Sequence, residues 1–270
     1  SGYGLRYKFG LFKQSFDANG AQKENADDWS KFGDPWSYRR YNHTMKIEFP
    51  EHTVLAVPYD VPVIGYGTNN EGTLRLWQCE AEHELNFDDF NKQDYDKALL
   101  EKNKAEDITR VLYPNDSTWD GKRLRIKQQY VLSSASLQDM LRTYKIAHGN
   151  NLSRFGEFYA VQLNDTHPAM SIPELIRLLM LEGMDFDSAF NVAQKTFSYT
   201  NHTVLGEALE KWPLDLMRSV VPQIADIICR IDHKLRTEMP MDFQERRANK
   251  LFIIDEDIVH MANLSIYVGS

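Results

Sequence analysis

The sequence predicts an α/β protein with a strand-rich part over residues 1–135 and alternating helices and strands over residues 136–270. In the first part, short segments alternate apolar and polar residues or are bounded by Gly and Pro, as β-strands are. In the second part, strand-like runs at 158–163 and 197–200 are separated by helical segments. That order favours a parallel sheet built from βαβ units. Hydrophobic residues make up 42% of the chain, which is enough material for a buried core.

The first strand is predicted over residues 3–12, and Asn19-Gly20 is a typical turn of a β-hairpin. The segments 45–49 and 124–127 alternate apolar and polar residues, which indicates two half-buried strands. Residues 53–57 are apolar almost throughout, as in a strand covered on both faces.

Residues 60–67 contain the Pro and Gly typical of a loop. Residues 94–107 have helical composition, with a thin apolar stripe of Tyr95, Ala98 and Leu99 among charges. Such a helix projects from the body or packs on another chain, and the alternative is a solvated surface helix. The segment 113–117 is predicted to form a loop between this helix and the strand at 124–127.

The second part begins with a short helix over 137–144, and the strand at 158–163 follows it. Ser171 and Glu174 have the spacing of a capping box, which predicts a helix over 171–182. Asp187 is expected to cap the next helix, which ends near residue 195 and leads into the strand at 197–200.

A helix is predicted over 205–211, and the chain after Trp212-Pro213 reads as helical to about residue 238, with a break at Pro222. Asp255 is expected to cap a helix that ends near residue 264 and runs into a final strand. Because the chain starts without Met and stops at a strand-to-loop turn, we expect an internal fragment of a longer protein.

Composition excludes several classes of function. A net charge of -8 and a pI near 5.5 argue against binding to a nucleic-acid backbone. No run approaches the ~20 apolar residues of a membrane helix, and no secretory signal is present. Cys79, Cys229 and the scattered histidines show no metal-ligand spacing. We therefore expect a cytoplasmic protein without a metal, a nucleic-acid partner or a membrane partner.

Polar side chains follow both predicted strands of the second part. The loop 164–168 contains Asp165 and His167, and the loop 201–203 contains Asn201 and His202. Open parallel sheets bind ligands outside the carboxyl ends of their strands. These side chains offer donors and acceptors for sugar hydroxyls, and an Asp can fix the tautomer of a nearby His. The alternative is an ordinary surface position for each histidine.

Two carboxylates, Glu207 and Glu210, follow the second loop about one helical turn apart. Such a pair suggests glycoside hydrolysis, although the helix dipole also favours carboxylates in a first helical turn. The chain contains no P-loop, no Gly-x-Gly-x-x-Gly and no Ser-His-Asp elbow. The residues alone thus predict an α/β domain with a polar ligand crevice.

Two longer segments closely resemble the glycogen, starch and maltodextrin phosphorylases: Val161–Pro168 (VQLNDTHP) and Tyr199–Pro213 (YTNHTVLGEALEKWP). The similarity extends from the first residues to the last. Further matching segments are Gly2–Tyr7, Pro58–Val63, Leu74–Trp77 and Arg110–Asp116.

The resemblance implies a GT-B-type glycosyltransferase that cleaves α-1,4-glucans with phosphate and releases glucose 1-phosphate. It implies that residues 1–270 are part of the N-terminal Rossmann-like domain. The family cofactor is pyridoxal phosphate, and its attachment lysine belongs to a C-terminal domain that this chain lacks. The chain alone is therefore expected to be inactive. The helix at 94–107 matches the family's intersubunit helix, which implies a homodimer.

The resemblance also implies which residues bind substrate, while it assigns no catalytic residue to this fragment. His202 would contact the hydroxymethyl end of the sugar, with Asn201 and Thr203 beside it. The residues implied to line the adjacent pocket are Asp165, His167, Arg125, Glu207 and Glu210. The residues implied to lie on a mobile gating loop are Asn115, Asp116 and Ser117.

Three positions depart from the family pattern. Ser117 stands where the family often has Asn, which puts a sugar contact there in doubt. Thr143 replaces the second Arg of the nucleotide site of muscle-type enzymes, so activation by AMP is not expected. The surroundings of Cys229 differ from the animal glycogen-storage site, which favours shorter dextrins such as maltodextrin. Two alternatives stay open, a non-catalytic carbohydrate-binding or structural half-domain and a glycosidase using Glu207 and Glu210.

Overall fold

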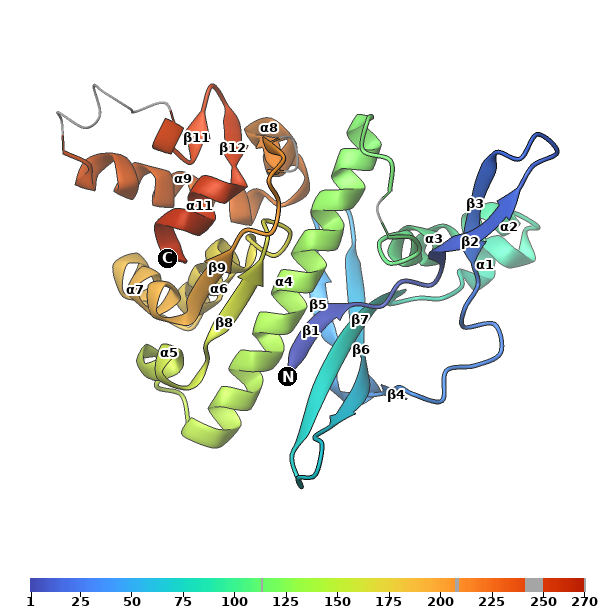
Figure 1. Ribbon diagram of the computed structural model, residues 1–270, viewed down its shortest axis with the longest axis horizontal. Helices are drawn as coiled ribbons and strands as arrows, with labels where there is room; N and C mark the ends of the chain where they lie inside the picture. The colour runs from blue at the N-terminus through green and yellow to red at the C-terminus, as the bar shows by residue number, and fades with distance from the viewer. Residues whose placement is uncertain (113, 207–208, 241–249, 270) are drawn as a thin grey trace. The chain divides into compact units, whose positions relative to one another are not determined.

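The computed structural model describes residues 1–112, 114–206, 209–240 and 250–269 (Figure 1). The chain divides into two compact units, Ser1–Ala135 and Ser136–Ser270. The long helix α4 (Trp119–His148) contributes its first half to one unit and its second half to the other.

The first unit is built on a five-stranded sheet with the order β1-β7-β6-β4, in which β5 also pairs with β6. Only the pairing of β1 with β7 is parallel among these strands. The strands are β1 (Gly2–Leu5), β4 (Tyr38–Arg39), β5 (Met45–Glu48), β6 (Thr53–Ile64) and β7 (Glu71–Ala81).

The strands predicted at 45–49 and 53–57 are confirmed, whereas the loop predicted over 60–67 is wrong for its first half. Strand β6 continues to Ile64, and Pro62 pairs with Thr73 of β7. Because β4 pairs with β6 only at Tyr59 and Asp60, Pro62 has a neighbour on one side alone. Proline is tolerated at such an edge.

Two smaller features flank this sheet. Strands β2 (Gly10–Phe16) and β3 (Gln22–Asp27) form an antiparallel hairpin, which confirms the turn at Asn19-Gly20. Gly20 has a φ of 79°, a value that favours glycine. A 3-10 turn, η1 (Tyr41–His43), leads into β5.

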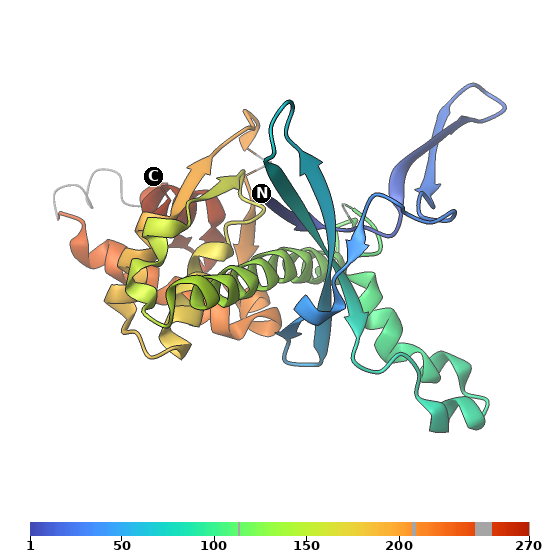
Figure 2. The same cartoon turned by 90° about the horizontal axis from the view of Figure 1, so that it is seen from below.

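The segment 94–107 is helical as predicted, but it forms two helices rather than one. These are α2 (Tyr95–Ala98) and α3 (Leu100–Asp107), and α1 (Phe87–Asn91) precedes them. The Ala98 carbonyl accepts a hydrogen bond from the Asn86 amide, which ties this break to the start of α1. Figure 2 shows α1 and α2 beyond the end of the sheet formed by β6 and β7.

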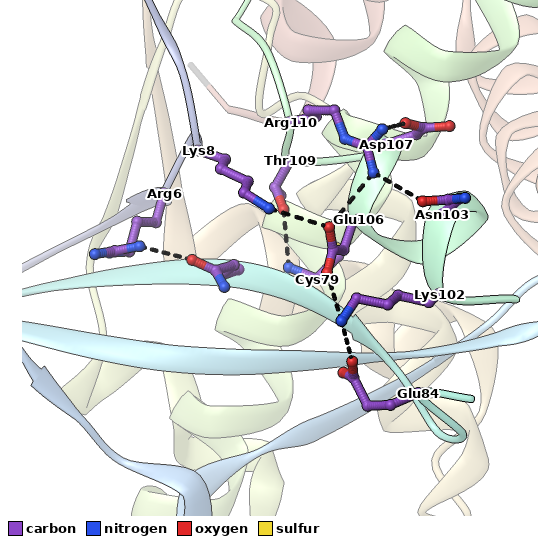
Figure 3. A network of polar contacts seen from close by, with 11 residues as sticks. Arg6, Lys8, Cys79, Glu84, Lys102, Asn103, Glu106, Asp107, Thr109 and Arg110 are labelled. Carbon is purple, nitrogen blue, oxygen red and sulfur yellow. Dashed lines mark hydrogen bonds and ion pairs between the residues drawn. The ribbon is translucent and has the colours of Figure 1, made fainter. Parts of the chain in front are cut away.

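Helix α3 is fixed to the sheet by a polar network (Figure 3). The Thr109 hydroxyl accepts a hydrogen bond from the Cys79 amide of β7 at 2.9 Å. The Glu106 carboxylate accepts a hydrogen bond from the Lys8 ammonium group at 3.4 Å, and the Lys102 ammonium group donates one to the Glu84 carboxylate at 2.6 Å. These contacts hold the base of the helical segment against the sheet.

The strand predicted at 124–127 is wrong, because these residues lie inside α4. The short helix predicted at 137–144 is the second half of the same helix, so the segment 114–118 connects two helices. Buried Ile126 and Tyr130 lie four residues apart, as do Val131 and Ala135, which is helical spacing. Phe49 packs edge-on against Tyr130 with ring centroids 5.7 Å apart, and α4 thereby covers the sheet.

The second unit contains a two-stranded parallel sheet of β8 (Val161–Asn164) and β9 (Phe197–Thr200). Helices α6 (Ser171–Leu181) and α7 (Phe186–Thr196) connect the two strands, so the predicted βαβ order is confirmed for this pair. Strand β8 starts later than predicted, because η2 (Leu152–Arg154) and α5 (Phe155–Phe158) occupy the preceding residues.

Both predicted helix caps of this unit are wrong. Met170 is the N-cap of α6 and makes no side-chain cap, while Glu174 is buried and bonds to Arg177 at 2.6 Å. The N-cap of α7 is Asp185, whose carboxylate accepts from the Ser188 amide at 3.0 Å. Asp187 lies in the first turn instead, where the helix dipole stabilises its negative charge.

The remaining elements are α8 (Leu214–Val220), α9 (Pro222–Glu238), α11 (Met261–Val268) and the antiparallel strands β10 (Lys211–Pro213), β11 (Ile254–Asp255) and β12 (Ile258–His260). The break at Pro222 is confirmed. The helix predicted over 205–211 is wrong for Leu205, Leu209 and Glu210, which are not helical, and for Lys211, which starts β10. Residues 207 and 208 lie outside the described residues.

The cap predicted at Asp255 and the final strand are also wrong. Asp255 lies in β11, and the chain turns through Glu256 and Asp257, whose φ values are 47° and 58°. Two successive positive φ values are typical of a tight hairpin turn. The last apolar run then forms α11 instead of a strand.

Candidate functional site

The two polar loops of the second unit lie side by side because their strands are aligned. Asn164 at the end of β8 pairs with Thr200 at the end of β9. The Asp165 amide then donates to the Thr200 carbonyl at 2.8 Å. Both loops therefore leave the same edge of the sheet, as the sequence predicts for the carboxyl ends of parallel strands.

Asp165 joins the two loops directly. Its backbone has a φ of 59°, a left-handed conformation that Asp tolerates better than most residues. One carboxylate oxygen, Oδ1, accepts a hydrogen bond from the His202 amide at 2.6 Å. Asp165 therefore fixes the backbone of the second loop, and no bond from Asp165 to a histidine ring occurs among the described contacts.

The exposed ring of His202 lies near the end of β8, with Nε2 3.4 Å from Asn164 Oδ1. The loop around it is braced internally. The Asn201 side chain donates to the Thr203 carbonyl at 2.8 Å and accepts from the Thr203 amide at 3.3 Å. These contacts hold the backbone and leave the imidazole at the surface.

His167 is oriented by Glu210, which comes from a distant part of the sequence. His167 Nδ1 lies 3.2 Å from Glu210 Oε1, and the Thr166 hydroxyl donates to Glu210 Oε2 at 3.0 Å. The Glu210 side chain is only 9% exposed, whereas that of His167 is 46% exposed. Glu210 thus supports the first loop from beneath and sets the position of the His167 ring.

The predicted helical pair of Glu207 and Glu210 is wrong for Glu210, which lies in a loop directly before β10. Glu207 lies outside the described residues. The Glu210 carboxylate already contacts Thr166 and His167, so its observed role is to hold the loop.

The four remaining candidates lie in the first unit. Asn115, Asp116 and Ser117 are exposed, and the Asn115 side chain accepts from the Ser117 amide at 3.0 Å. Asp116 Oδ2 lies 3.6 Å from Arg125 Nε, so this segment contacts the start of α4. Arg125 is mostly buried, with 16% of its side chain exposed.

Sequence reasoning gives no role to Thr166, which lies in the first loop, or to Tyr199, which lies in the strand before the second loop. Thr166 is 1% exposed and holds Glu210. Burial raises the pKa of Tyr199, and the charge of Asp165 adds to that effect. The Tyr199 hydroxyl is buried and has no hydrogen-bond partner within the described parts of the chain. Their closeness in the sequence to Asp165 and His202 is the feature from which they could have been predicted.

The described residues contain no group of three or more potential metal ligands. No helix in the described ranges combines the length and the apolar character needed to cross a membrane.

Comparison with known proteins connects these loops to a family. A family model described as carbohydrate phosphorylase matches residues 1–270. The chain is 42% identical over 288 residues to the muscle form of glycogen phosphorylase from Mus musculus, covering 98% of this chain and 34% of that protein. It is 42% identical over 298 residues to the liver form from Homo sapiens, covering 100% and 35%. The chain spans about a third of the length of these relatives.

Proposed function

Because the chain belongs to the carbohydrate phosphorylase family, we propose that it forms part of an enzyme that cleaves terminal α-1,4-linked glucose from a glucan. Phosphate is the proposed attacking group, and glucose 1-phosphate is the proposed product. The observation that carries this proposal is the linked pair of loops at β8 and β9, held together by the bond from the His202 amide to Asp165.

The loops offer the chemistry of a sugar-binding wall. Exposed imidazoles of His202 and His167 can donate to or accept from hydroxyl groups, and Asn201 and Thr203 lie beside them. Glu210 holds His167 from the buried side, so the ring is positioned before substrate arrives. Such preorganisation supports the alignment of a reacting sugar. We propose these residues as positioning groups and assign no catalytic residue to this chain.

In the first unit, we propose that Asn115, Asp116 and Ser117 lie on a gating loop and that Arg125, which contacts this loop, lines the pocket next to the sugar. The contact of Asp116 with Arg125 at 3.6 Å supports this assignment. Loops with few contacts are the segments that gate active sites.

Pyridoxal phosphate is the proposed cofactor of the complete enzyme, where its phosphate supplies acid/base support. We propose that its attachment lysine lies in a C-terminal domain, and we assign no residue of this chain to the cofactor.

We propose that the complete enzyme is a cytoplasmic homodimer that uses the helices at 94–107. Apolar side chains on and beside these helices are exposed, among them Tyr95 (53%), Leu99 (38%) and Leu100 (49%). An apolar patch on a projecting helix favours a protein interface. Analytical ultracentrifugation of the complete enzyme should show a dimer that Leu100→Asp weakens.

We propose short dextrins as substrates and no activation by AMP. Thr143 offers no positive charge for a nucleotide phosphate, and its hydroxyl bonds within the protein to the Asp139 carbonyl at 2.9 Å. The neighbouring Arg142 is paired with Asp139 at 2.8 Å. The residues around Cys229 differ from those of the animal glycogen-storage site, which supports the proposal that this second glucan-binding site is lost.

The decisive experiment measures glucose 1-phosphate released from maltoheptaose by the complete enzyme, with and without phosphate. We expect phosphate-dependent release, and we expect His202→Asn to lower kcat/KM by about tenfold or more, as loss of one good hydrogen bond would. His83→Asn, which changes an exposed histidine in the first unit, is the matched control.

Release of free glucose without phosphate would support a glycosidase instead. Binding of maltoheptaose without any cleavage would support a non-catalytic carbohydrate-binding protein.

A further inference from the structure

A cavity of about 710 Å³ lies in the first unit, between the turn before β6, helix α3 and the start of α4. This volume is within the range of small-molecule sites. Three of its lining residues, Val111, Pro114 and Leu124, are apolar and partly exposed, so the cavity has an apolar floor.

Basic residues outnumber acidic ones around this floor. The cavity is lined by four basic residues, including Arg110, and three acidic ones, including Asp107 and Asp120, which leaves one positive charge in excess. Arg110 is already paired with carboxylates of α3, because it contacts Asp107 at 2.9 Å and Glu106 at 3.4 Å (Figure 3). Asp120 lies in the first turn of α4, where the helix dipole favours its charge.

The other three basic residues are poorly neutralised. Arg123 and Lys127 both reach the same carboxylate, that of Glu51, at 3.8 and 3.7 Å. These distances exceed the 2.7–2.9 Å of strong charge-assisted hydrogen bonds. Lys104 also lines the cavity, and its charge acts on Lys127. One carboxylate therefore serves two cations, and a third cation lies nearby.

The pKa of Lys127 reflects this crowding. Burial lowers it, and although Glu51 opposes the change, the charges of Arg123 and Lys104 lower it further. A negatively charged ligand at this position would offset both the burial and the repulsion among the cations.

We propose that this cavity binds a small organic anion. Its apolar body would rest on Val111 and Leu124, and its phosphate or carboxylate head would lie among Lys104, Arg123 and Lys127. The cavity belongs to the first unit and is separate from the polar loops at β8 and β9. Because Pro114 lines it, the ligand would also contact the segment that carries Asn115.

Isothermal titration calorimetry of the full chain with phenyl phosphate and with benzoate tests the proposal. At least one of these anions should bind with a stoichiometry of one, and the better ligand identifies the head group. Neutral phenol should not bind, and inorganic phosphate, which lacks the apolar body, should bind more weakly. Failure of both aromatic anions, or equal binding of phenol, overturns the proposal.

Three variants test the assigned residues. Arg123→Gln and Lys127→Met should each weaken binding by about tenfold, equivalent to ~1.4 kcal/mol. Glu51→Gln should tighten it, because this change removes the carboxylate that competes for both cations. Lys122→Gln removes the same charge from the same helix but does not line the cavity, so it should bind like the unaltered chain.

The Glu51→Gln result keeps the test valid if Lys127→Met fails to fold. The Glu51 side chain is 57% exposed, so its replacement should leave the thermal unfolding transition unchanged. Weaker binding by Glu51→Gln, or an equal loss in Lys122→Gln and Arg123→Gln, contradicts the assigned position.

Discussion

Asp165 meets two separate structural requirements, one through its backbone and one through its side chain. Its left-handed backbone, with φ of 59°, turns the chain out of β8, and its carboxylate binds the His202 amide at 2.6 Å. The first feature needs a residue that tolerates positive φ, and the second needs an acceptor of suitable length. Asp and Asn meet both requirements.

Replacing Asp165 separates these features. Asp165→Ala should lower the free energy of unfolding by about 1–3 kcal/mol, because the charge-assisted bond is lost and Ala is strained at positive φ. Asp165→Asn should cost much less. Urea unfolding of the three proteins provides the measurement, and equal stability of the Ala and Asn variants would contradict this account.

His52 should make stability depend on pH. Burial lowers its pKa below the usual 6.5, and the charge of Lys127 lowers it further. The folded state therefore favours the neutral ring, and its contribution is complete above pH 6.5. As the pH falls below 6.5, the unfolded chain binds a proton more readily than the folded protein, and stability is lost.

His52→Phe removes this titration while retaining a ring against Phe49, whose centroid lies 5.6 Å from that of His52. Both ring nitrogens of His52 are buried without a hydrogen-bond partner in the described structure, so an apolar ring should be accepted. Urea midpoints at pH 7.5 and 5.5 should differ less for His52→Phe than for the unaltered chain. An unchanged difference would rule out His52 as the cause.

The candidate site could be predicted from sequence only in part. Asp165 and His202 could be found because each follows a strand, and the two strands are successive in the chain. The contact of His167 with Glu210 could not, because 43 residues separate them and only the folded strand β10 brings Glu210 back. Roles in sugar binding stay predictions for all of these residues.

At the scale of elements, α4 depends on a close approach at Gly121. A Cβ built on Gly121 would lie 1.8 Å from the Asn115 carbonyl oxygen. The backbone of Asn115 therefore rests directly on the first turn of the helix, and this contact fixes where the exposed segment 115–117 begins.

Gly121→Ala should consequently destabilise the protein by about 1–3 kcal/mol, despite the better helix propensity of Ala. Lys122→Ala, one residue further along the same helix, is the control and should be nearly neutral. Thermal unfolding measures the difference, and limited proteolysis should show faster cleavage near Asn115 in the Gly121 variant alone. A stabilised Gly121→Ala protein would contradict the packing described here.

The elements that were mispredicted share a cause. Leu124 to Lys127 alternates like a strand, but four residues cannot show the longer spacing through Tyr130 that defines the buried face of α4. Asp255 resembles a helix cap, yet the following Glu256 and Asp257 turn the chain into a hairpin. In both cases, residues outside the short pattern decide the structure.

At the scale of the whole molecule, our proposal is that the chain provides one wall of a sugar site. That residues 1–270 form part of one N-terminal Rossmann-like domain stays a prediction. What the fold does establish is the parallel pair β8 and β9 with polar loops at one edge, in a chain of the carbohydrate phosphorylase family. Positioning groups without the opposite wall cannot align phosphate and sugar for reaction.

The isolated chain should therefore release no glucose 1-phosphate from maltoheptaose, even with phosphate and added pyridoxal phosphate. A coupled assay for glucose 1-phosphate, run beside the complete enzyme at the same molar concentration, provides the measurement. Activity above the no-protein background would overturn the assignment of the reacting groups to another part of the enzyme.

Because the register between β8 and β9 aligns the two polar loops, insertions between the strands and deletions within them should have different effects. The loops at Asp165 and His202 are aligned by the ladder between the strands, not by the length of chain that joins them. Insertions at the turn around Gly183, between α6 and α7, should therefore be neutral in descendants of this sequence. A single deletion within 197–200 would instead turn every following side chain to the other face of the sheet.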